Sequence, residues 1–108
     1  MIRIVIADDY PLFREGIHLM LQKEKDLKIT GEAGNGEELL KVVEREQPDI
    51  VITDIEMPVM NGIEATKRIK SKFPATGVIA LTMFGDEHFL VDMLEAGASG
   101  YLLKSCNK

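Results

Sequence analysis

Three short runs of β-branched and aliphatic residues constrain the fold of this chain more than any other feature. They occupy residues 2–7, 50–53 and 78–81, and polar side chains rarely interrupt them. A strand buried on one face alternates apolar and polar residues, whereas a strand covered on both faces has a continuous apolar run. These runs therefore predict central strands of a sheet with helices on both sides. Residues 27–30 and 101–104 alternate instead, which predicts two half-covered edge strands.

Amphipathic segments of helical length separate the five expected strands. Their apolar residues recur three and four positions apart, which is the spacing of one helix face. The expected helices cover residues 11–24, 37–47, 62–73 and 86–96. Asn61 precedes the third of them and Glu64 follows three residues later, which is typical of a helix N-terminus. The inward stripes include Met20, Met93 and Leu94, which we expect to be buried.

Strands that alternate with helices imply right-handed βαβ crossovers and an α/β fold with a parallel sheet. With the alternating strands at the edges, the expected arrangement is a doubly wound five-stranded sheet of order 2-1-3-4-5. We expect one domain over residues 1–108. Only four residues follow the fifth strand, too few for a closing helix, so we expect the natural chain to continue and this one to be an ordered fragment.

Composition narrows the function classes. Thirteen basic against eighteen acidic residues give a net charge of −5, so the chain is a poor nucleic-acid binder by itself. A single cysteine, Cys106, excludes an internal disulfide and fits a reducing interior. No apolar run approaches the roughly 18 residues of a membrane span. We expect a soluble intracellular domain.

Residues that can bind metal or phosphate follow or end four of the expected strands. In open parallel sheets, ligands bind at the carboxyl ends of the strands near the point where strand order reverses, here between the first and third strands. The residues concerned are Asp8, Asp9, Asp54, Thr82 and Lys104. Two carboxylates 4 Å apart repel by roughly 4 kcal/mol at an effective dielectric near 20, so the cluster favours a cation. Oxygen ligands without a nearby cysteine or histidine favour Mg²⁺.

Asp54 is central in this arrangement and is the expected nucleophile. A carboxylate neutralised by a metal can attack phosphorus and form an aspartyl-phosphate. Thr82 would supply a hydrogen-bond donor and Lys104 a positive charge for the phosphoryl oxygens. The alternative is that these are solvated acids at strand ends, with Lys104 an exposed charge.

These residues resemble the receiver domain of bacterial two-component response regulators. The resemblance rests on four segments in order, IVIADD (4–9), DIEMPVMNG (54–62), LT (81–82) and AGASGYLLK (96–104). It covers the chain except for a last helix and implies the flavodoxin-like fold. Residues 11–16 and 97–104 are most similar to the NarL/FixJ (LuxR-type) branch. Members of that branch usually carry a C-terminal helix-turn-helix DNA-binding domain, which we expect in the full-length protein and which this chain lacks.

The resemblance implies a phosphorylation switch. Asp54 would accept a phosphoryl group from a histidine kinase in a Mg²⁺-dependent reaction. The metal ligands would be Asp8, Asp9, Asp54 and the backbone carbonyl of Glu56. Thr82 and Lys104 would contact the phosphoryl group, and Thr82 and Tyr101 would change conformation as the switch.

The switch would control an output domain or partner protein, and through it DNA binding and transcription. The domain itself would bind neither nucleic acid nor membrane, would be cytoplasmic, and would turn over no external metabolite, so we do not expect an enzyme. Phosphorylation could drive homodimerisation through the helix that carries His88, Val91 and Asp92, close to Tyr101.

Two positions depart from the family pattern. Ser105 follows Lys104 where many receivers have proline, and Met83 is larger than the small residue often found beside Thr82. His18 and His88 lie on expected helices without a second metal ligand at suitable spacing, so we expect solvent exposure or core packing for both.

Two other function classes are open to the same fold. A pseudo-receiver binds proteins without phosphotransfer, but it is expected to have lost at least one of the five strand-end residues. A phosphohydrolase of the haloacid dehalogenase type needs a second aspartate two residues after the nucleophile, where this chain has Glu56. A flavodoxin-type cofactor site is not expected, because no Ser/Thr/Gly-rich loop follows the first strand.

Overall fold

Five parallel strands and four helices alternate along the chain in the computed structural model, which describes residues 1–55, 57–82 and 87–103. The strands are β1 (Ile2–Ala7), β2 (Leu27–Ala33), β3 (Ile50–Asp54), β4 (Gly77–Thr82) and β5 (Gly100–Leu103). The helices are α1 (Pro11–Leu21), α2 (Gly36–Glu46), α3 (Gly62–Lys72) and α4 (Glu87–Ala96). The sheet order is β2-β1-β3-β4-β5, with every neighbouring pair parallel. This confirms the expected topology.

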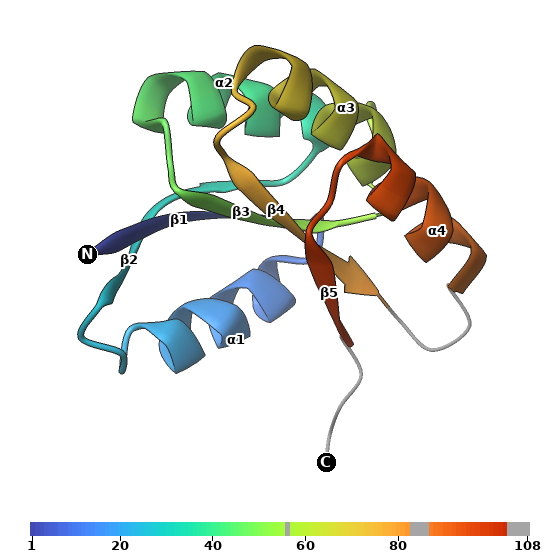
Figure 1. Ribbon diagram of the computed structural model, residues 1–108. Helices are drawn as coiled ribbons and strands as arrows, with labels where there is room; N and C mark the ends of the chain where they lie inside the picture. The colour runs from blue at the N-terminus through green and yellow to red at the C-terminus, as the bar shows by residue number, and fades with distance from the viewer. Residues whose placement is uncertain (56, 83–86, 104–108) are drawn as a thin grey trace.

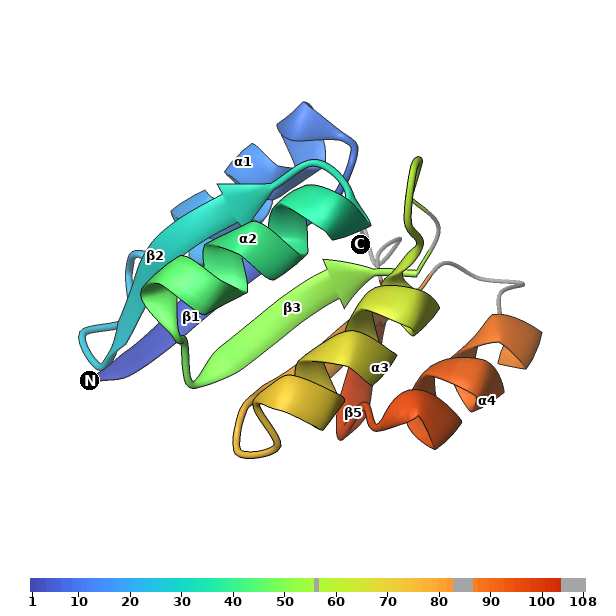
Figure 2. The same ribbon diagram turned by 90° about the horizontal axis from the view of Figure 1, so that it is seen from above.

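Helices cover both faces of the sheet (Figure 1). Of the described helices, α1 lies on one face, and α2, α3 and α4 lie side by side on the other, as the view from above shows (Figure 2). The central strands β1, β3 and β4 send side chains into a core on each face of the sheet, which explains their continuous apolar runs.

Neighbouring residues of one strand enter two separate core clusters. In β1, Val5 packs with residues of α2, α3 and α4, whereas Ile4 and Ile6 pack on the side of α1. Val51 and Ile52 of β3 divide in the same way. Successive strand side chains point to opposite faces, so both clusters draw on every central strand.

Two expectations about the core are wrong. Met20 is 66% exposed and Leu94 is 45% exposed, whereas Met93 is fully buried as expected. Met20 lies at the border of the α1 face that packs on the sheet. No second helix among the described residues lies beside α1 to cover it. Leu94 follows the buried Met93 and lies on the outer side of α4. A hydrophobic stripe gives the direction of a helix face, but burial also needs a neighbouring element on that side.

The first helix is also shorter than expected, ending at Leu21. The next residues form turns, with the Glu24 N–H donating to the Leu21 carbonyl at 3.0 Å. Neither glycine nor proline marks this end, so the sequence contains no stop signal there. The chain then turns back into β2, with the Leu27 N–H donating to the Glu24 carbonyl at 3.4 Å.

Replacing Asn61 by alanine is expected to lower the free energy of unfolding by about 1 kcal/mol. The Asn61 side chain accepts a hydrogen bond from the Glu64 N–H at 3.0 Å, and alanine leaves that donor at the start of α3 without this acceptor. Urea denaturation measures the loss. Asn61→Asp is the control, because aspartate caps as well as asparagine. Equal losses in both variants would show that the cap contributes nothing.

Candidate functional site

Three carboxylates converge at the carboxyl edge of the sheet. Asp8 and Asp9 follow β1, and Asp54 is the last residue of β3. β1 and β3 are hydrogen-bonded neighbours at the point where strand order reverses. One oxygen from each carboxylate lies within 4.8 Å of the others. The convergence expected for these three residues is therefore confirmed.

Backbone hydrogen bonds orient the two buried members of this acidic cluster. Asp8 has no exposed surface, and its Oδ1 accepts from the Tyr10 N–H at 2.8 Å. Asp54 is 8% exposed, and its Oδ1 accepts from the Ile55 N–H at 2.8 Å. Asp9 is exposed at the rim. Both buried side chains are thus held by the chain that immediately follows them.

The chemistry of the donor set fits a hard divalent cation. Two carboxylates 4.8 Å apart repel by roughly 3.5 kcal/mol at an effective dielectric of 20. Asp8, Asp9 and Asp54 offer only oxygen donors, which Mg²⁺ prefers, and Mg²⁺ is commonly bound through one or two carboxylates together with water and phosphate oxygens. The acidic cluster can therefore hold a metal ion, and a bound cation would relieve the repulsion.

The starts of α2 and α3 approach the segment from Asp54 to Met60 through close backbone contacts that the sequence did not predict. A Cβ atom at Gly62 would lie 2.1 Å from the Asp54 carbonyl oxygen, and one at Gly36 would lie 2.2 Å from the Met60 carbonyl oxygen. The Gly62 N–H donates to the Ile55 carbonyl at 2.7 Å, and the Gly36 N–H donates to that of Met60 at 2.9 Å. The two glycines therefore let the starts of α3 and α2 close on this segment.

Other expected site residues are only partly described. β4 ends at Thr82, at the same edge as Asp54, but the Thr82 side chain lies outside the described part. Lys104, Glu56, Met83 and Ser105 also lie outside it. Tyr101 is 52% exposed and pairs in register with Ala80, whose side chain belongs to the core under α3 and α4. Tyr101 therefore lies on the α4 side of the sheet.

The two histidines are away from the acidic cluster. The Nδ1 atom of His18 lies 3.2 Å from a Glu32 carboxylate oxygen, and the side chain is 40% exposed. The exposed His88 ring contacts the Phe89 ring, with 4.0 Å between the centroids. Within the described ranges, neither belongs to a group of three or more metal-ligating side chains.

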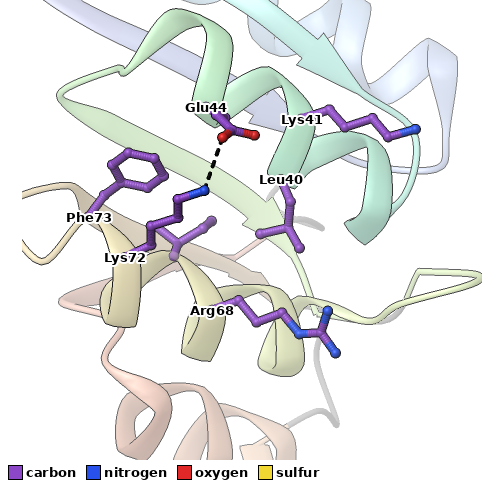
Figure 3. Close-up of a pocket in the computed structure, with 7 residues that line it drawn as sticks. Leu40, Lys41, Glu44, Arg68, Lys72 and Phe73 are labelled. Carbon is purple, nitrogen blue, oxygen red and sulfur yellow. Dashed lines mark hydrogen bonds and ion pairs between the residues drawn. The ribbon is translucent and has the colours of Figure 1, made fainter.

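A groove of about 290 Å³ lies elsewhere, between α2 and α3 (Figure 3). Leu40, Ile69 and Phe73 contribute its apolar part. Three of its charged residues already have partners, since Lys72 contacts Glu44, also in the groove, at 3.0 Å and Arg68 contacts Glu64 at 2.9 Å. The groove shares no residue with the acidic cluster. Because several of its charged side chains are already in ion pairs, it is a weaker candidate for a functional site.

Comparisons with known proteins agree with this geometry. A family model described as the response regulator receiver domain matches residues 4–108. The transcriptional regulatory protein LnrK of Bacillus subtilis (strain 168) is 46% identical over 104 residues, which are 96% of this chain and 47% of that protein. The oxygen regulatory protein NreC of Staphylococcus epidermidis is 40% identical over 104 residues, 95% of this chain and 48% of that protein. The chain therefore spans about half the length of these curated relatives.

Solved structures give the same result. A two-component response regulator of the LuxR family from Aurantimonas sp. SI85-9A1 matches with a TM-score of 0.91 and 34% identity, covering 99% of this chain and 76% of that one. The isolated REC domain of RcsB from Salmonella enterica serovar Typhimurium, solved in the presence of the phosphomimetic BeF₃⁻, matches with a TM-score of 0.88 and 29% identity. That match covers 98% of this chain and 79% of the RcsB chain.

Proposed function

Because this chain belongs to the response regulator receiver domain family, we propose that it is a switch in which Asp54 accepts a phosphoryl group from a histidine kinase. The observation that carries the proposal is the convergence of Asp8, Asp9 and Asp54 where strand order reverses. Of the two buried carboxylates, only Asp54 has surface exposed to an incoming donor. Asp54 is therefore the acceptor that the geometry favours.

Phosphotransfer at this position is a direct displacement at phosphorus. A carboxylate oxygen of Asp54 forms a bond to phosphorus while the phosphorus–nitrogen bond of phosphohistidine breaks. The electron pair of the broken bond stays on the imidazole, which takes up a proton from solvent. The hydrogen bond from the Ile55 N–H orients the carboxylate for this attack. Thr82 and Lys104 are the proposed partners of the phosphoryl oxygens.

Mg²⁺ is the proposed metal. Asp8, Asp9 and Asp54, together with the backbone carbonyl of Glu56, would hold it. When bound, the ion supplies positive charge that offsets the repulsion between the carboxylates and the phosphoryl oxygens.

The proposed output is transcription, through a DNA-binding domain outside this chain. LnrK carries the name of a transcriptional regulatory protein and is about twice as long as its match to this chain, which supports this output. Phosphorylation would alter the surface formed by α4 and β5, on which Tyr101 of β5 and Val91 and Leu94 of α4 are each about half exposed. That apolar surface supports homodimerisation of the phosphorylated form.

The proposal also places the protein in the cytoplasm. As a separate finding, no helix among the described residues is long and apolar enough to cross a membrane.

Incubation with acetyl phosphate and Mg²⁺ is expected to add one phosphoryl group to the chain. The added group should be lost at high pH, because acyl phosphates are labile to base, and EDTA in place of Mg²⁺ should abolish the gain. Intact-mass spectrometry measures all three arms. A folded sample that gains no mass in the Mg²⁺ arm would instead favour a protein-binding module without phosphotransfer.

A further inference from the structure

An arginine from α1 reaches the strand ends that carry the acidic cluster. The Nη1 atom of Arg14 donates to the Asp8 carbonyl at 2.6 Å and lies 3.4 Å from the Ala33 carbonyl. Asp8 is the first residue after β1, and Ala33 is the last residue of β2. One guanidinium nitrogen therefore ties together two strand ends at the edge where the carboxylates converge.

The Asp8 backbone is held from both sides. Its N–H donates to the Ala33 carbonyl at 3.0 Å, and its carbonyl accepts from Arg14. Its side chain accepts from the Tyr10 N–H, which fixes the start of the turn into α1. Arg14 thus completes a set of contacts around Asp8, which carries one carboxylate of the cluster and directly precedes Asp9, which carries another.

Glu32 and Gly34 of the neighbouring chain segment accommodate the guanidinium. The Nε atom of Arg14 lies 3.3 Å from a Glu32 carboxylate oxygen, and the Arg14 side chain is only 21% exposed. A Cβ atom at Gly34 would lie 3.2 Å from Nη1, closer than most side chains allow. Arginine presents fixed donors and keeps its charge at all physiological pH values. The site therefore holds a permanent cation against the backbone carbonyl of Asp8.

We propose that Arg14 is a positioning residue for the metal-binding carboxylates, acting through the Asp8 backbone. The inference rests on the proposed function, because it assumes that Asp8 and Asp9 bind Mg²⁺. Arg14 lies three residues before Ile17 and seven before Leu21, so it shares the sheet-facing side of α1 with apolar residues. An unbranched apolar side chain could fill that space, so packing alone does not require arginine.

Arg14→Met keeps most of the side-chain volume and removes the donors. We expect it to raise the Mg²⁺ concentration needed for half-maximal phosphorylation about tenfold, the usual scale for losing a group that orients a metal ligand. The rate at saturating Mg²⁺ should change much less. A second readout needs no phosphorylation: the Mg²⁺ concentration at which the metal raises the Tm should shift by the same factor. Arg14→Lys keeps the positive charge but lacks the planar set of guanidinium donors. Its Mg²⁺ dependence should therefore lie between those of the unchanged chain and Arg14→Met.

Arg3→Met is the matched control. Arg3 pairs with Glu46 at 3.4 Å at the opposite edge of the sheet, so its loss should leave both Mg²⁺ readouts unchanged. Wild-type Mg²⁺ dependence in a folded Arg14→Met variant would overturn the inference. If Arg14→Met does not fold, wild-type Mg²⁺ dependence in Arg14→Lys overturns it instead. Failure of the unchanged chain to bind Mg²⁺ or accept phosphate would contradict the proposed function, which separates the two results.

Discussion

Asp54→Asn is expected to gain no phosphoryl group under conditions in which the unchanged chain gains one. Asparagine has nearly the same shape as aspartate and can keep the hydrogen bond from the Ile55 N–H. Its amide lacks the negative charge that makes the carboxylate oxygen a nucleophile. The measurement is intact mass after incubation with acetyl phosphate and Mg²⁺, and the expected change is complete loss of the added group.

The same substitution should not destabilise the fold. Asp8 and Asp54 are both buried, and removing one of two like charges relieves their repulsion in the absence of metal. We expect the free energy of unfolding in EDTA to stay equal or to rise. Loss of phosphorylation could then not be attributed to unfolding. Urea denaturation of both proteins in EDTA measures this.

Asp49→Asn is the matched control for the chemistry. Asp49 lies just before β3, at the opposite end of the strand from Asp54, and its Oδ2 accepts from the Arg3 N–H at 2.8 Å. The Asp49→Asn variant should gain a phosphoryl group on Asp54 as completely as the unchanged chain does. A full mass gain in Asp54→Asn would show that another side chain is the acceptor, and the assignment of the central residue would be wrong.

The acidic cluster was predictable because it depends on topology more than on side-chain detail. Continuous apolar runs indicated parallel central strands, and parallel strands end at the same edge. Asp8 and Asp54 follow from that placement alone, since neighbouring parallel strands in register must bring their ends together. The cap at Asn61 was predictable for a similar reason, because the side chain and its partner are three residues apart.

The close contacts around the acidic cluster were not predictable in the same way. Gly36 and Gly62 begin helices, where the local pattern requires no glycine, and the reason for each lies in a carbonyl from another segment. Arg14 is a charged residue on an otherwise apolar helix face, which the sequence alone shows. Its hydrogen bond to the Asp8 carbonyl became evident only in three dimensions. Met20 shows the converse, an apolar residue on the expected stripe that no neighbouring element covers.

Gly62→Ala is expected to destabilise the chain by about 3 kcal/mol and to slow phosphorylation of Asp54 by about a hundredfold. Two effects oppose each other at this first position of α3. Alanine favours a helix by up to about 1 kcal/mol over glycine. The added Cβ, however, would lie 2.1 Å from the Asp54 carbonyl oxygen and 3.1 Å from the Ile55 Cα. These are backbone atoms, which cannot rotate away, so the steric cost exceeds the gain in helix propensity.

Gly16→Ala separates the two effects. Gly16 lies within α1, and a Cβ there would have nothing within 4 Å, so only the helix preference acts. The free energy of unfolding of this variant should rise by about 0.5–1 kcal/mol, and Asp54 should be phosphorylated at the normal rate. Urea denaturation and the initial rate with acetyl phosphate compare the two substitutions directly. Because the Gly62 contact is with the backbone of Asp54 itself, the rate should fall even under conditions in which Gly62→Ala is fully folded. A folded Gly62→Ala variant with a normal rate would show that this backbone contact does not hold the phosphoacceptor in place.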